Sequence, residues 1–267
     1  MNNQKIQQDK VEAFYNLQVL NNPDMPAILG VSSKLGADFR DFEEWKSFYS
    51  LVTLRNDMRV LELGCGGGRW VERLSRYVKE VIGVDLSKNA INYAKKCANV
   101  KKIHNVEYIH SSIREYEADG FFDIIYLSGV LLYIDNEEVL YDIEKYNRCL
   151  KQDGIFVVRD SITNVNHILH HQEGYCSLYR TLEDFEKFFK EVNFRLTKKR
   201  KAFPNLCLSN FLNLSSIKSL YQILQPIKLQ KFLIFLLDVI SRRDEGLPHW
   251  VINGYNYSHD FLIFSKS

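Results

Sequence analysis

Four glycines within five positions mark the stretch VLELGCGGGRW, residues 60–70. Glycine has no Cβ and tolerates positive φ, so a ligand can approach the main chain closely at such a turn. The apolar run before the glycines predicts a buried strand, and residues 69–78 predict an amphipathic helix. A helix that begins at this turn points unpaired N–H groups toward the same spot, which suits a carboxylate or a phosphate. The stretch therefore predicts a ligand site at the backbone of Gly64, Cys65 and Gly66.

Two classes of ligand compete for this turn, a dinucleotide and S-adenosylmethionine. In the dinucleotide fingerprint G-x-G-x-x-G/A, Arg69 would occupy the last small position, where helix and strand meet closely. Glu62, an acid inside the preceding strand, is not part of that fingerprint either. Asp85, at the end of the next predicted strand, can accept hydrogen bonds from ribose hydroxyls of either ligand. An NAD-dependent oxidoreductase is therefore the disfavoured alternative.

The stretch VLELGCGGG resembles the first motif of class I S-adenosylmethionine-dependent methyltransferases, in which an acidic residue precedes the glycine loop by two positions. VIGVD, VEYIHSSI, FDIIYLSGVLLYI and RCLKQDGIFVVRDS are similar to later motifs of that family in the same order, so the resemblance covers about residues 58–165. It implies S-adenosylmethionine as the cofactor and S-adenosylhomocysteine as the product. Ser112 and Ile113 stand where the family often has Asp-Ala, which weakens the adenine contact expected there. The cofactor-binding residues that the resemblance implies are Glu62, Gly64, Cys65, Gly66, Asp85, Leu86, Ser112, Ile113, Leu127 and Ser128.

The order of the predicted elements indicates the fold. Strand-like and helix-like patterns alternate from residue 59 to residue 160, which favours a parallel sheet covered by helices on both faces. The family resemblance implies a Rossmann-like α/β fold with a seven-stranded, mostly parallel sheet, in which residues 194–203 and 258–266 form the last two strands and the final one is antiparallel. We expect one methyltransferase domain with a helical leader or lid (1–57), a cofactor-binding core (58–165), a substrate-side region with strand six (166–203), a helical insertion (204–257) and a last strand (258–267).

Most of the catalytic candidates lie in VVRDSITNVNHILHHQEGYCSLYR, where the fifth predicted strand ends and the next segment begins. Methyl transfer from a sulfonium is an in-line displacement, so alignment alone can supply much of the rate and a general base is optional. The catalytic candidates are Asp160, His170 and Tyr133, and the candidate substrate contacts are Arg159, Arg180 and Tyr175. Competing interpretations are an ion pair for Asp160 and Arg159, a structural hydrogen bond for the histidine, and packing for Tyr133.

Metal, disulfide, nucleic-acid and membrane binding are not predicted. His167, His170 and His171 fall within about one turn of an expected helix, where the two adjacent side chains point apart and cannot share a metal ion. The 5 cysteines are scattered without a CxxC pair, and a net charge of +2 creates no strong field for nucleic acid. The sequence has neither a signal-peptide run nor an apolar stretch of about 18 residues, which favours a cytoplasmic protein without stable membrane insertion.

The insertion at 204–257 is unusually apolar. Apolar residues surround most of its predicted helices and basic residues are few, which disfavours a helix that lies on a membrane surface. We expect this segment to pack against the core or against a second copy of the chain in a homodimer.

The combined expectation is a methyltransferase that acts on a small-molecule acceptor. The chain lacks the [DNS]-PP-[FYW] and Pro-Cys motifs of enzymes that methylate DNA bases. Extra segments at both ends suit a closed pocket better than an open groove. We expect methylation at an oxygen of a sugar, a phosphate-containing or a nucleotide-linked precursor of a bacterial surface glycan or natural product. The alternatives are a methyltransferase for RNA or protein, and a scaffold that binds S-adenosylmethionine without catalysis.

Overall fold

The computed structural model of the protein describes residues 6–21, 34–171, 174–202, 250–252 and 255–267, together with a few helical positions between 219 and 234. The strands are β1 (Arg59–Leu63), β2 (Glu80–Asp85), β3 (Val106–His110), β4 (Phe122–Ser128), β5 (Leu150–Thr163), β6 (His167–His170), β7 (Cys176–Thr181), β8 (Phe194–Lys201), β9 (Trp250–Ile252) and β10 (Tyr255–Lys266). The helices are α1 (Gln8–Asn21), α2 (Lys34–Leu51), α3 (Arg69–Leu74), α4 (Lys88–Lys101), the 3₁₀ turn η1 (Leu131–Tyr133), α5 (Asn136–Asn147) and α6 (Leu182–Glu191).

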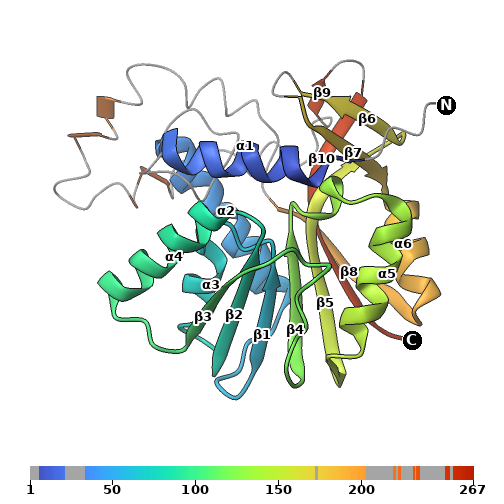
Figure 1. Cartoon of the computed structure of the whole chain (residues 1–267), viewed down its shortest axis with the longest axis horizontal. Coiled ribbons are helices and arrows are strands. Elements are labelled where there is room, and N and C mark those ends of the chain that lie inside the picture. The colour runs from blue at the N-terminus through green and yellow to red at the C-terminus, as the bar shows by residue number, and fades with distance from the viewer. Residues whose placement is uncertain are drawn as a thin grey trace.

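A sheet of ten described strands forms the centre of the fold, and its main path follows the order β3-β2-β1-β4-β5-β10-β8 (Figure 1). Strands β1 to β5 pair in parallel, while β10 runs antiparallel between β5 and β8. Parallel strands are buried on both faces, which explains the nearly continuous apolar runs of β1, β2 and β4. The strand order reverses between β1 and β4, and ligands of open α/β sheets bind beyond the carboxyl ends of the strands at such a point. The expected Rossmann-like fold is confirmed, including the antiparallel last strand.

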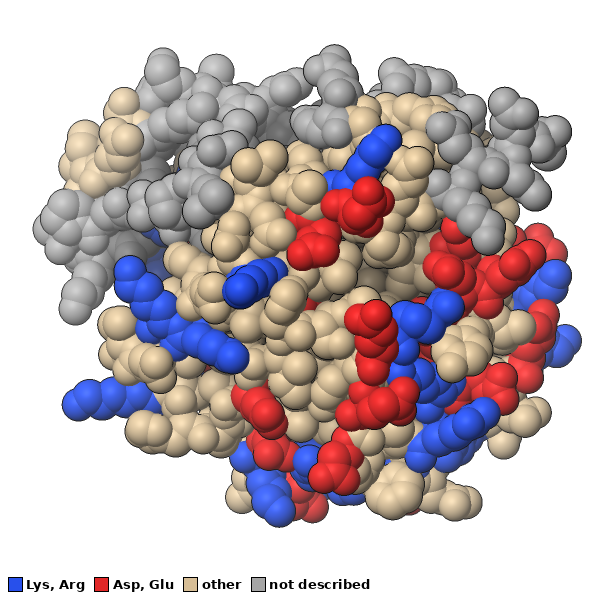
Figure 2. Space-filling model, viewed as in Figure 1, with Lys and Arg blue, Asp and Glu red and all other residues tan. Residues whose placement is uncertain are grey.

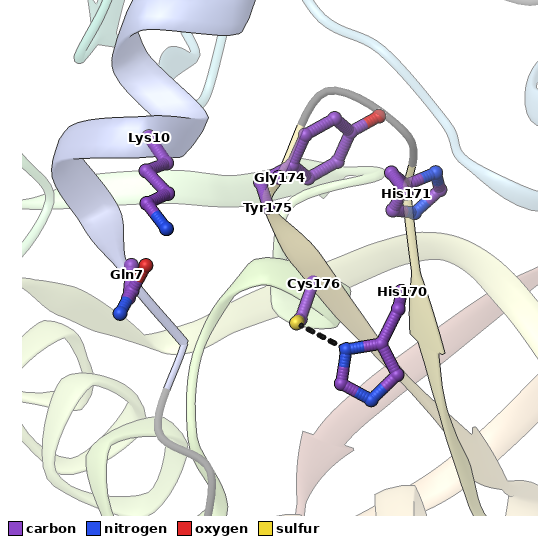
Figure 3. Close-up of a pocket in the computed structure, with 7 residues that line it drawn as sticks. All are labelled: Gln7, Lys10, His170, His171, Gly174, Tyr175 and Cys176. Atoms are coloured by element: carbon purple, nitrogen blue, oxygen red, sulfur yellow. Dashed lines mark hydrogen bonds between the residues drawn. The ribbon is translucent and has the colours of Figure 1, made fainter.

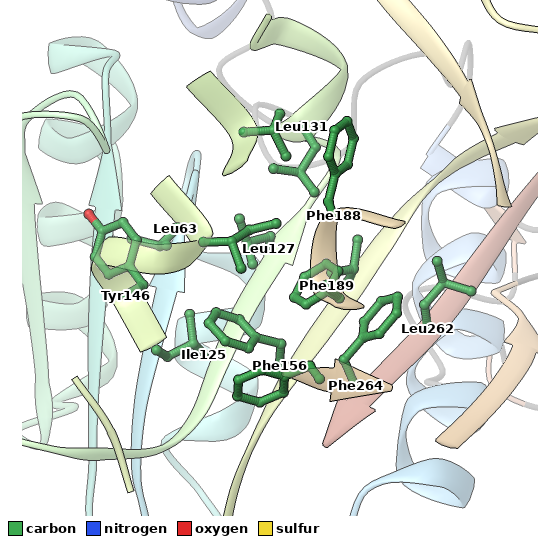
Figure 4. Close-up of a cluster of buried hydrophobic side chains, with 14 of the residues drawn as sticks. Leu63, Ile125, Leu127, Leu131, Tyr146, Phe156, Phe188, Phe189, Leu262 and Phe264 are labelled. Atoms are coloured by element: carbon green, nitrogen blue, oxygen red, sulfur yellow. The ribbon is translucent and has the colours of Figure 1, made fainter. Parts of the chain in front are cut away.

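Helices cover both faces of this sheet. Helices α5 and α6 pack against one face, where Phe189 of α6 stacks on Phe264 of β10 with ring centroids 3.8 Å apart (Figure 4). On the other face, α2, α3 and α4 contribute Phe48, Trp70 and Ile91 to a second apolar cluster. Burying a side chain of this size contributes about 1.5–3 kcal/mol relative to leaving it exposed. The two clusters fix the strands and, through them, the loops at the carboxyl ends of the strands.

Helix α1 lies across the carboxyl end of the sheet (Figure 1). Asn16, in the middle of α1, accepts hydrogen bonds from the Ser87 hydroxyl and the Asn89 backbone N–H, both at the start of α4. Ile6, just before the helix, donates its backbone N–H to the carboxylate of Asp135. These contacts hold α1 at two places over the edge where β2 and β4 end.

The histidine-rich segment is a β-hairpin and not the helix that the sequence predicts. Strand β6 pairs antiparallel with β7, and the register places His167 opposite Tyr179 and His170 opposite Cys176. Strand β7 then joins the end of β5 in parallel. A strand of 4 residues is too short for its periodicity to distinguish it from a helix.

Most of the insertion at 204–257 lies outside the described residues, and so do the helical packing and the homodimer contact that we expect for it. Among the helices that are described, none combines the length and the apolar character needed to cross a membrane.

Candidate functional site

The glycine turn between β1 and α3 combines tight packing with an open side. Gly64, Gly66 and Gly68 all have positive φ, at 75°, 53° and 82°. A Cβ on Gly64 would lie 2.0 Å from a methyl carbon of Val130, so no side chain fits there. A Cβ on Gly66 would have no neighbour within 4 Å, so this glycine borders free space. The turn therefore leaves its backbone open at Gly66, which fits a bound ligand.

Asp85 ends β2 with its carboxylate directed at the same turn. Its two oxygens accept hydrogen bonds from the backbone N–H of Gly66 at 2.7 Å and of Ser87 at 2.8 Å. Burial raises the pKa of this carboxyl, and the two N–H groups oppose the rise. A carboxylate has about four lone-pair sites, so two remain for hydroxyl groups of a ligand. Asp85 is therefore positioned to hold a ribose beside the glycine turn.

Glu62 supplies a second carboxyl beneath the turn. It is 1% exposed, and its Oε2 meets no hydrogen-bond donor among the described residues. Burial raises the pKa of Glu62 well above the usual range, although the charge of Arg69 opposes the rise. A buried oxygen without a partner costs free energy until a ligand or a water molecule satisfies it. The open turn, Asp85 and Glu62 together form a cradle that fits the cofactor implied by the sequence.

The other predicted cofactor residues lie along the same edge of the sheet. The residues after β2 and β3 and at the end of β4 are Leu86, Ser112, Ile113, Leu127 and Ser128. The Ser112 hydroxyl accepts a hydrogen bond from the Glu115 N–H, and the Tyr146 hydroxyl donates to the Ile113 carbonyl, so the loop after β3 is fixed. Cys65 is buried, and burial raises the pKa of its thiol well above the usual range. It therefore packs as an unreactive, apolar side chain.

Two tyrosines join α1 to η1, which follows β4. The Tyr15 hydroxyl donates a hydrogen bond to the Tyr133 hydroxyl at 2.6 Å, and Gln8 Nε2 donates to the Tyr133 carbonyl at 2.5 Å. Burial raises the pKa of both phenols, so both stay protonated near neutral pH. The pair holds α1 over the sheet edge and is unsuited to act as a general base.

Aromatic rings form a wall beside this contact, and we call the set of Phe14, Tyr15, Tyr133 and Tyr175 the aromatic wall. Tyr175, after the β6–β7 turn, has its ring centroid 4.5 Å from that of Phe14 and 6.0 Å from that of Tyr133. At the other end, Tyr15 is followed by Asn16, which accepts a hydrogen bond from Ser87, two residues after Asp85. The wall therefore extends from the cofactor side of the edge to the hairpin.

Asp160 is a buried carboxylate inside β5. The sequence places it at the end of the strand, whereas β5 continues to Thr163 because β7 and β10 pair with it there. Asp160 is 1% exposed; its Oδ1 accepts the Ser161 N–H at 2.7 Å, and its Oδ2 has no hydrogen-bond partner within the described part of the chain. Burial raises the pKa of Asp160 to about 6, although backbone N–H groups and the charges of Arg159 and Arg180 oppose the rise. A poised carboxylate with one free oxygen is what a general base requires.

Arg180 binds other parts of the protein. It is 1% exposed and donates hydrogen bonds to the carbonyls of Leu131 and Ile134 and, at 2.8 Å, to the side chain of Asn136. These bonds fasten β7 to η1 and use the guanidinium donors. The role of Arg180 as a substrate contact stays a prediction.

A buried group of charges fastens α2 to the core, and the sequence analysis missed it. Glu44 is 0% exposed, and its carboxylate lies 2.9 Å from Arg40, 2.5 Å from Arg69 and 2.8 Å from Arg159. Burial alone would raise the pKa of Glu44, but these guanidinium groups hold it well below its usual range. Arg159 thus takes part in an ion pair, as in the competing interpretation, and its role as a substrate contact stays a prediction. The sequence feature that could have predicted this cluster is the pair of adjacent acids, Glu43 and Glu44, within an aromatic-rich helix. A buried acid needs a cationic partner. We call Arg40, Glu44, Arg69 and Arg159 the Glu44 cluster.

His170 and Tyr175 meet at a cavity between α1 and the hairpin. The cavity measures about 250 Å³, and Gln7 and Lys10 of the N-terminal segment line its other side (Figure 3). The Nδ1 of His170 lies 3.1 Å from the Sγ of Cys176 across the hairpin. The catalytic role that we expect for His170 stays a prediction.

Comparison with known proteins places this site in a family. Residues 60–154 match the family model of a methyltransferase domain. Residues 60–154 therefore carry a methyltransferase domain. The chain is 25% identical, over 96% of its length, to a probable (S)-tetrahydroprotoberberine N-methyltransferase 2 of Papaver bracteatum. It covers 64% of that relative, which is less than two thirds of the relative's length.

Solved structures of methyltransferases share the fold. Phosphoethanolamine N-methyltransferase 1 of Haemonchus contortus, in complex with phosphoethanolamine and S-adenosylhomocysteine, matches with a TM-score of 0.64 at 12% identity, over 97% of this chain and 49% of that chain. The 1,6-didemethyltoxoflavin-N1-methyltransferase of Burkholderia thailandensis, with 1,6-didemethyltoxoflavin and S-adenosylhomocysteine bound, matches with a TM-score of 0.63 at 11% identity, over 97% of this chain and 88% of that chain. At such low identity the likeness establishes the fold of this chain and no more.

Proposed function

We propose that this protein is a cytoplasmic enzyme that transfers the methyl group of S-adenosylmethionine to a small-molecule acceptor. The observation that carries the proposal is the cradle at the end of β1, formed by the open backbone at Gly66, the carboxylate of Asp85 and the unpartnered oxygen of Glu62. Its place in a methyltransferase domain favours S-adenosylmethionine over a dinucleotide. The related enzymes of Haemonchus contortus and Burkholderia thailandensis, which bind S-adenosylhomocysteine, support the same choice.

Each part of the edge has a role in this proposal. Bound S-adenosylmethionine supplies a methyl group activated on a sulfonium. Asp85 would bind the ribose hydroxyls, and the loop at Ser112 and Ile113 would contact the adenine. The methionine end would lie along Leu127 and Ser128, with Glu62, Gly64, Cys65 and Leu86 completing the enclosure around the cofactor.

We assign the acceptor atom to an oxygen because of Asp160. Above a pH of about 6 its carboxylate is ionised. The free oxygen of Asp160 can then take the proton of an acceptor hydroxyl, while the oxygen of that hydroxyl receives the methyl group. Helix α1 and the aromatic wall would exclude water and align the two reactants. A covered site of this kind suits a sugar, a phosphate-containing or a nucleotide-linked precursor of a bacterial surface glycan or natural product better than RNA or a protein surface.

A nitrogen acceptor is the second candidate, and the aromatic wall favours it. Faces of aromatic rings attract cations, which is worth about 0.5–2 kcal/mol per contact. Rings from Tyr15, Tyr133 and Tyr175 could therefore receive an amine or ammonium group. The N-methyltransferase of Papaver bracteatum is consistent with this alternative.

Titration calorimetry tests the cofactor assignment directly. Purified protein should bind S-adenosylmethionine and S-adenosylhomocysteine, while NADH serves as the comparison ligand. Asp85→Ala should weaken binding of both sulfur compounds by about tenfold or more, because charge-assisted hydrogen bonds are worth roughly 1.5–3 kcal/mol. Asp153→Ala, which removes an exposed carboxylate from the first part of β5, is the matched control and should bind normally. Binding of NADH alone would refute the assignment.

Turnover separates the enzyme from a non-catalytic scaffold. Labelled S-adenosylmethionine would be incubated with panels of sugars, nucleotide sugars and amines, and methylated products would be detected by mass spectrometry. Products on hydroxyl acceptors would support the oxygen assignment, whereas products on amines alone would replace it with the second candidate. Cofactor binding without turnover on any panel or on cell extract would point to a scaffold.

A further inference from the structure

The cavity between α1 and the β6–β7 hairpin has no part in the roles assigned so far. It measures about 250 Å³ and is lined by Gln7, Lys10, His170, His171, Tyr175 and Cys176. Figure 3 shows Gln7 and Lys10 extending from the start of α1 on one side, with the hairpin residues on the other. The volume is below the typical range for a complete small-molecule site, so the cavity suits one group of a larger ligand.

The polar groups around the cavity are predominantly hydrogen-bond donors. Lys10 carries a full positive charge with three N–H donors, Gln7 brings an amide, and each imidazole can present an N–H. The described lining residues include no acidic side chain. The start of α1 adds the partial positive charge of a helix N-terminus on the same side. Asp9 also lies in the first turn of α1, but it does not line the cavity, and the described lining favours an oxyanion over a cation.

Contacts within the hairpin hold the histidines in place before any ligand arrives. The His171 ring stacks on Tyr175 with centroids 4.1 Å apart and planes within 9°, and its Nε2 lies 2.8 Å from the Ser177 hydroxyl oxygen. The Nδ1 of His170 lies against the Cys176 thiol, and with the thiol as donor the ring presents Nε2–H. Side chains that are already oriented lose little freedom when they bind a ligand.

The aromatic wall connects this cavity with the proposed methyl-transfer site. Tyr175 belongs to both: its ring lines the cavity and lies 6.0 Å from the ring of Tyr133. Tyr133 in turn accepts the hydrogen bond of Tyr15, and the next residue, Asn16, accepts a hydrogen bond from Ser87, two residues after Asp85. An elongated acceptor could therefore follow the wall from the methyl group to the cavity.

We propose that this cavity binds a phosphate group carried by the acceptor, with Lys10 as its main charge partner and His170 and His171 as further donors. The proposal rests on the proposed function, because it identifies the cavity as the distal part of the acceptor site. Lys10 lies on α1 and the histidines lie on the hairpin, so a bound phosphate joins the two elements and holds α1 closed over the site. Acceptors that carry a phosphate are thereby favoured over neutral ones.

Binding of inorganic phosphate and phenyl phosphate to the full chain tests the proposal. The imidazole signals of the protein would be followed by NMR during each titration, at constant ionic strength with chloride, and assigned by single histidine substitutions. Both probes should shift the signals of His170 and His171 saturably, and phenyl phosphate should bind more tightly because its ring can contact Tyr175. Lys10→Gln should weaken both by about tenfold or more, since a charge-assisted hydrogen bond is lost. Lys10→Arg should retain most of the affinity.

The control variant is Lys96→Gln, which removes an exposed lysine of the same charge from α4 and should bind both probes normally. Unshifted histidine signals, or equal affinities in wild type and Lys10→Gln, would overturn the phosphate site. Equal affinities of the two probes would indicate a site for free phosphate and overturn its assignment to the acceptor. Calorimetry with S-adenosylmethionine on the same samples tests the proposed function separately. If the protein binds phosphate as expected but does not bind S-adenosylmethionine, the anion site is supported and the proposed methyl transfer is refuted.

Discussion

Glu44 on α2 and Asp160 on β5 are both buried carboxylates, but their surroundings differ. The Glu44 carboxylate lies within 2.9 Å of three arginines, and its pKa is held well below the usual range. Asp160 keeps an oxygen without a hydrogen-bond partner in the described part of the chain, and burial raises its pKa to about 6. Glu62 resembles Asp160, with a free oxygen and a raised pKa.

The comparison indicates which buried charges hold the fold and which await a ligand. Three guanidinium groups compensate the Glu44 carboxylate, so the protein itself has used its charge. A carboxylate that is buried without enough hydrogen-bond partners destabilises the folded state. Proteins tend to retain such destabilising groups at functional sites. Position supports the distinction, because the Glu44 cluster joins α2 to α3 and β5, whereas Glu62 lies beside the glycine turn.

Glu44→Gln should have the largest effect on stability. The substitution keeps the shape of the side chain but leaves Arg40, Arg69 and Arg159 without their shared anion, which should lower the free energy of unfolding by about 3–5 kcal/mol. Urea unfolding at neutral pH would measure the change. Glu144→Gln removes one side of an exposed ion pair with Arg148 and should change stability by less than about 0.5 kcal/mol. A similar small loss for Glu44→Gln would mean that the cluster is not a structural anchor.

Asp160→Asn should lower kcat by about 100-fold, roughly 2.7 kcal/mol, if the acceptor is a hydroxyl, because general-base catalysis contributes about that much. Wild-type kcat should rise with pH through a value of about 6, where the Asp160 carboxyl ionises. The variant should lose this step while its affinity for S-adenosylmethionine stays unchanged. A variant with normal kcat and an unchanged pH profile would remove Asp160 from the chemistry.

The same Asp160→Asn substitution should stabilise the fold, opposite in sign to Glu44→Gln. The folded pKa of about 6 lies above the usual aspartate value, so ionised Asp160 destabilises the folded state as pH rises from about 4 through 6. The amide can still accept the Ser161 N–H. We expect the variant to be about 1–3 kcal/mol more stable than wild type near pH 8, with the difference vanishing near pH 4. Denaturant midpoints of variant and wild type at both pH values would measure this difference in stability. A destabilised variant would mean that Asp160, like Glu44, holds the fold.

The strands, the glycine turn and the helix around residues 59–85 agree with the sequence prediction because they depend on local backbone. The glycine turn follows directly from its strand, and Asp85 ends the next strand, so contiguous motifs specify the cradle. Gly64 illustrates the reason. This position requires glycine because its φ is positive and because the side chain of Val130 occupies the space of a Cβ. Val130 itself lies in the recognised motif FDIIYLSGVLLYI. The β-hairpin with His170 escaped prediction because 4 residues give no usable periodicity.

The acceptor side depends on contacts between residues far apart in the sequence. Tyr15 and Tyr133 are 118 positions apart, and no sequence pattern near either residue predicts the hydrogen bond between them. Arg69 is a similar case: the sequence revealed its conflict with a dinucleotide fingerprint but not its ion pairs with Asp41 and Glu44. A single sequence identifies the charged residue, whereas its partner is decided by how the helices pack.

The position of β10 affects the order in which the protein can fold during synthesis. Strand β10 lies between β5 and β8, yet residues 202–254 separate β8 from β10 along the chain. At the rate at which ribosomes extend a chain, the synthesis of residues 202–254 takes roughly 3–10 s. During that interval the edges of β5 and β8 that face β10 have no strand beside them in the nascent chain. The basic run KKRK of β8 then protects its edge, because lysines on an open strand discourage pairing with neighbouring chains.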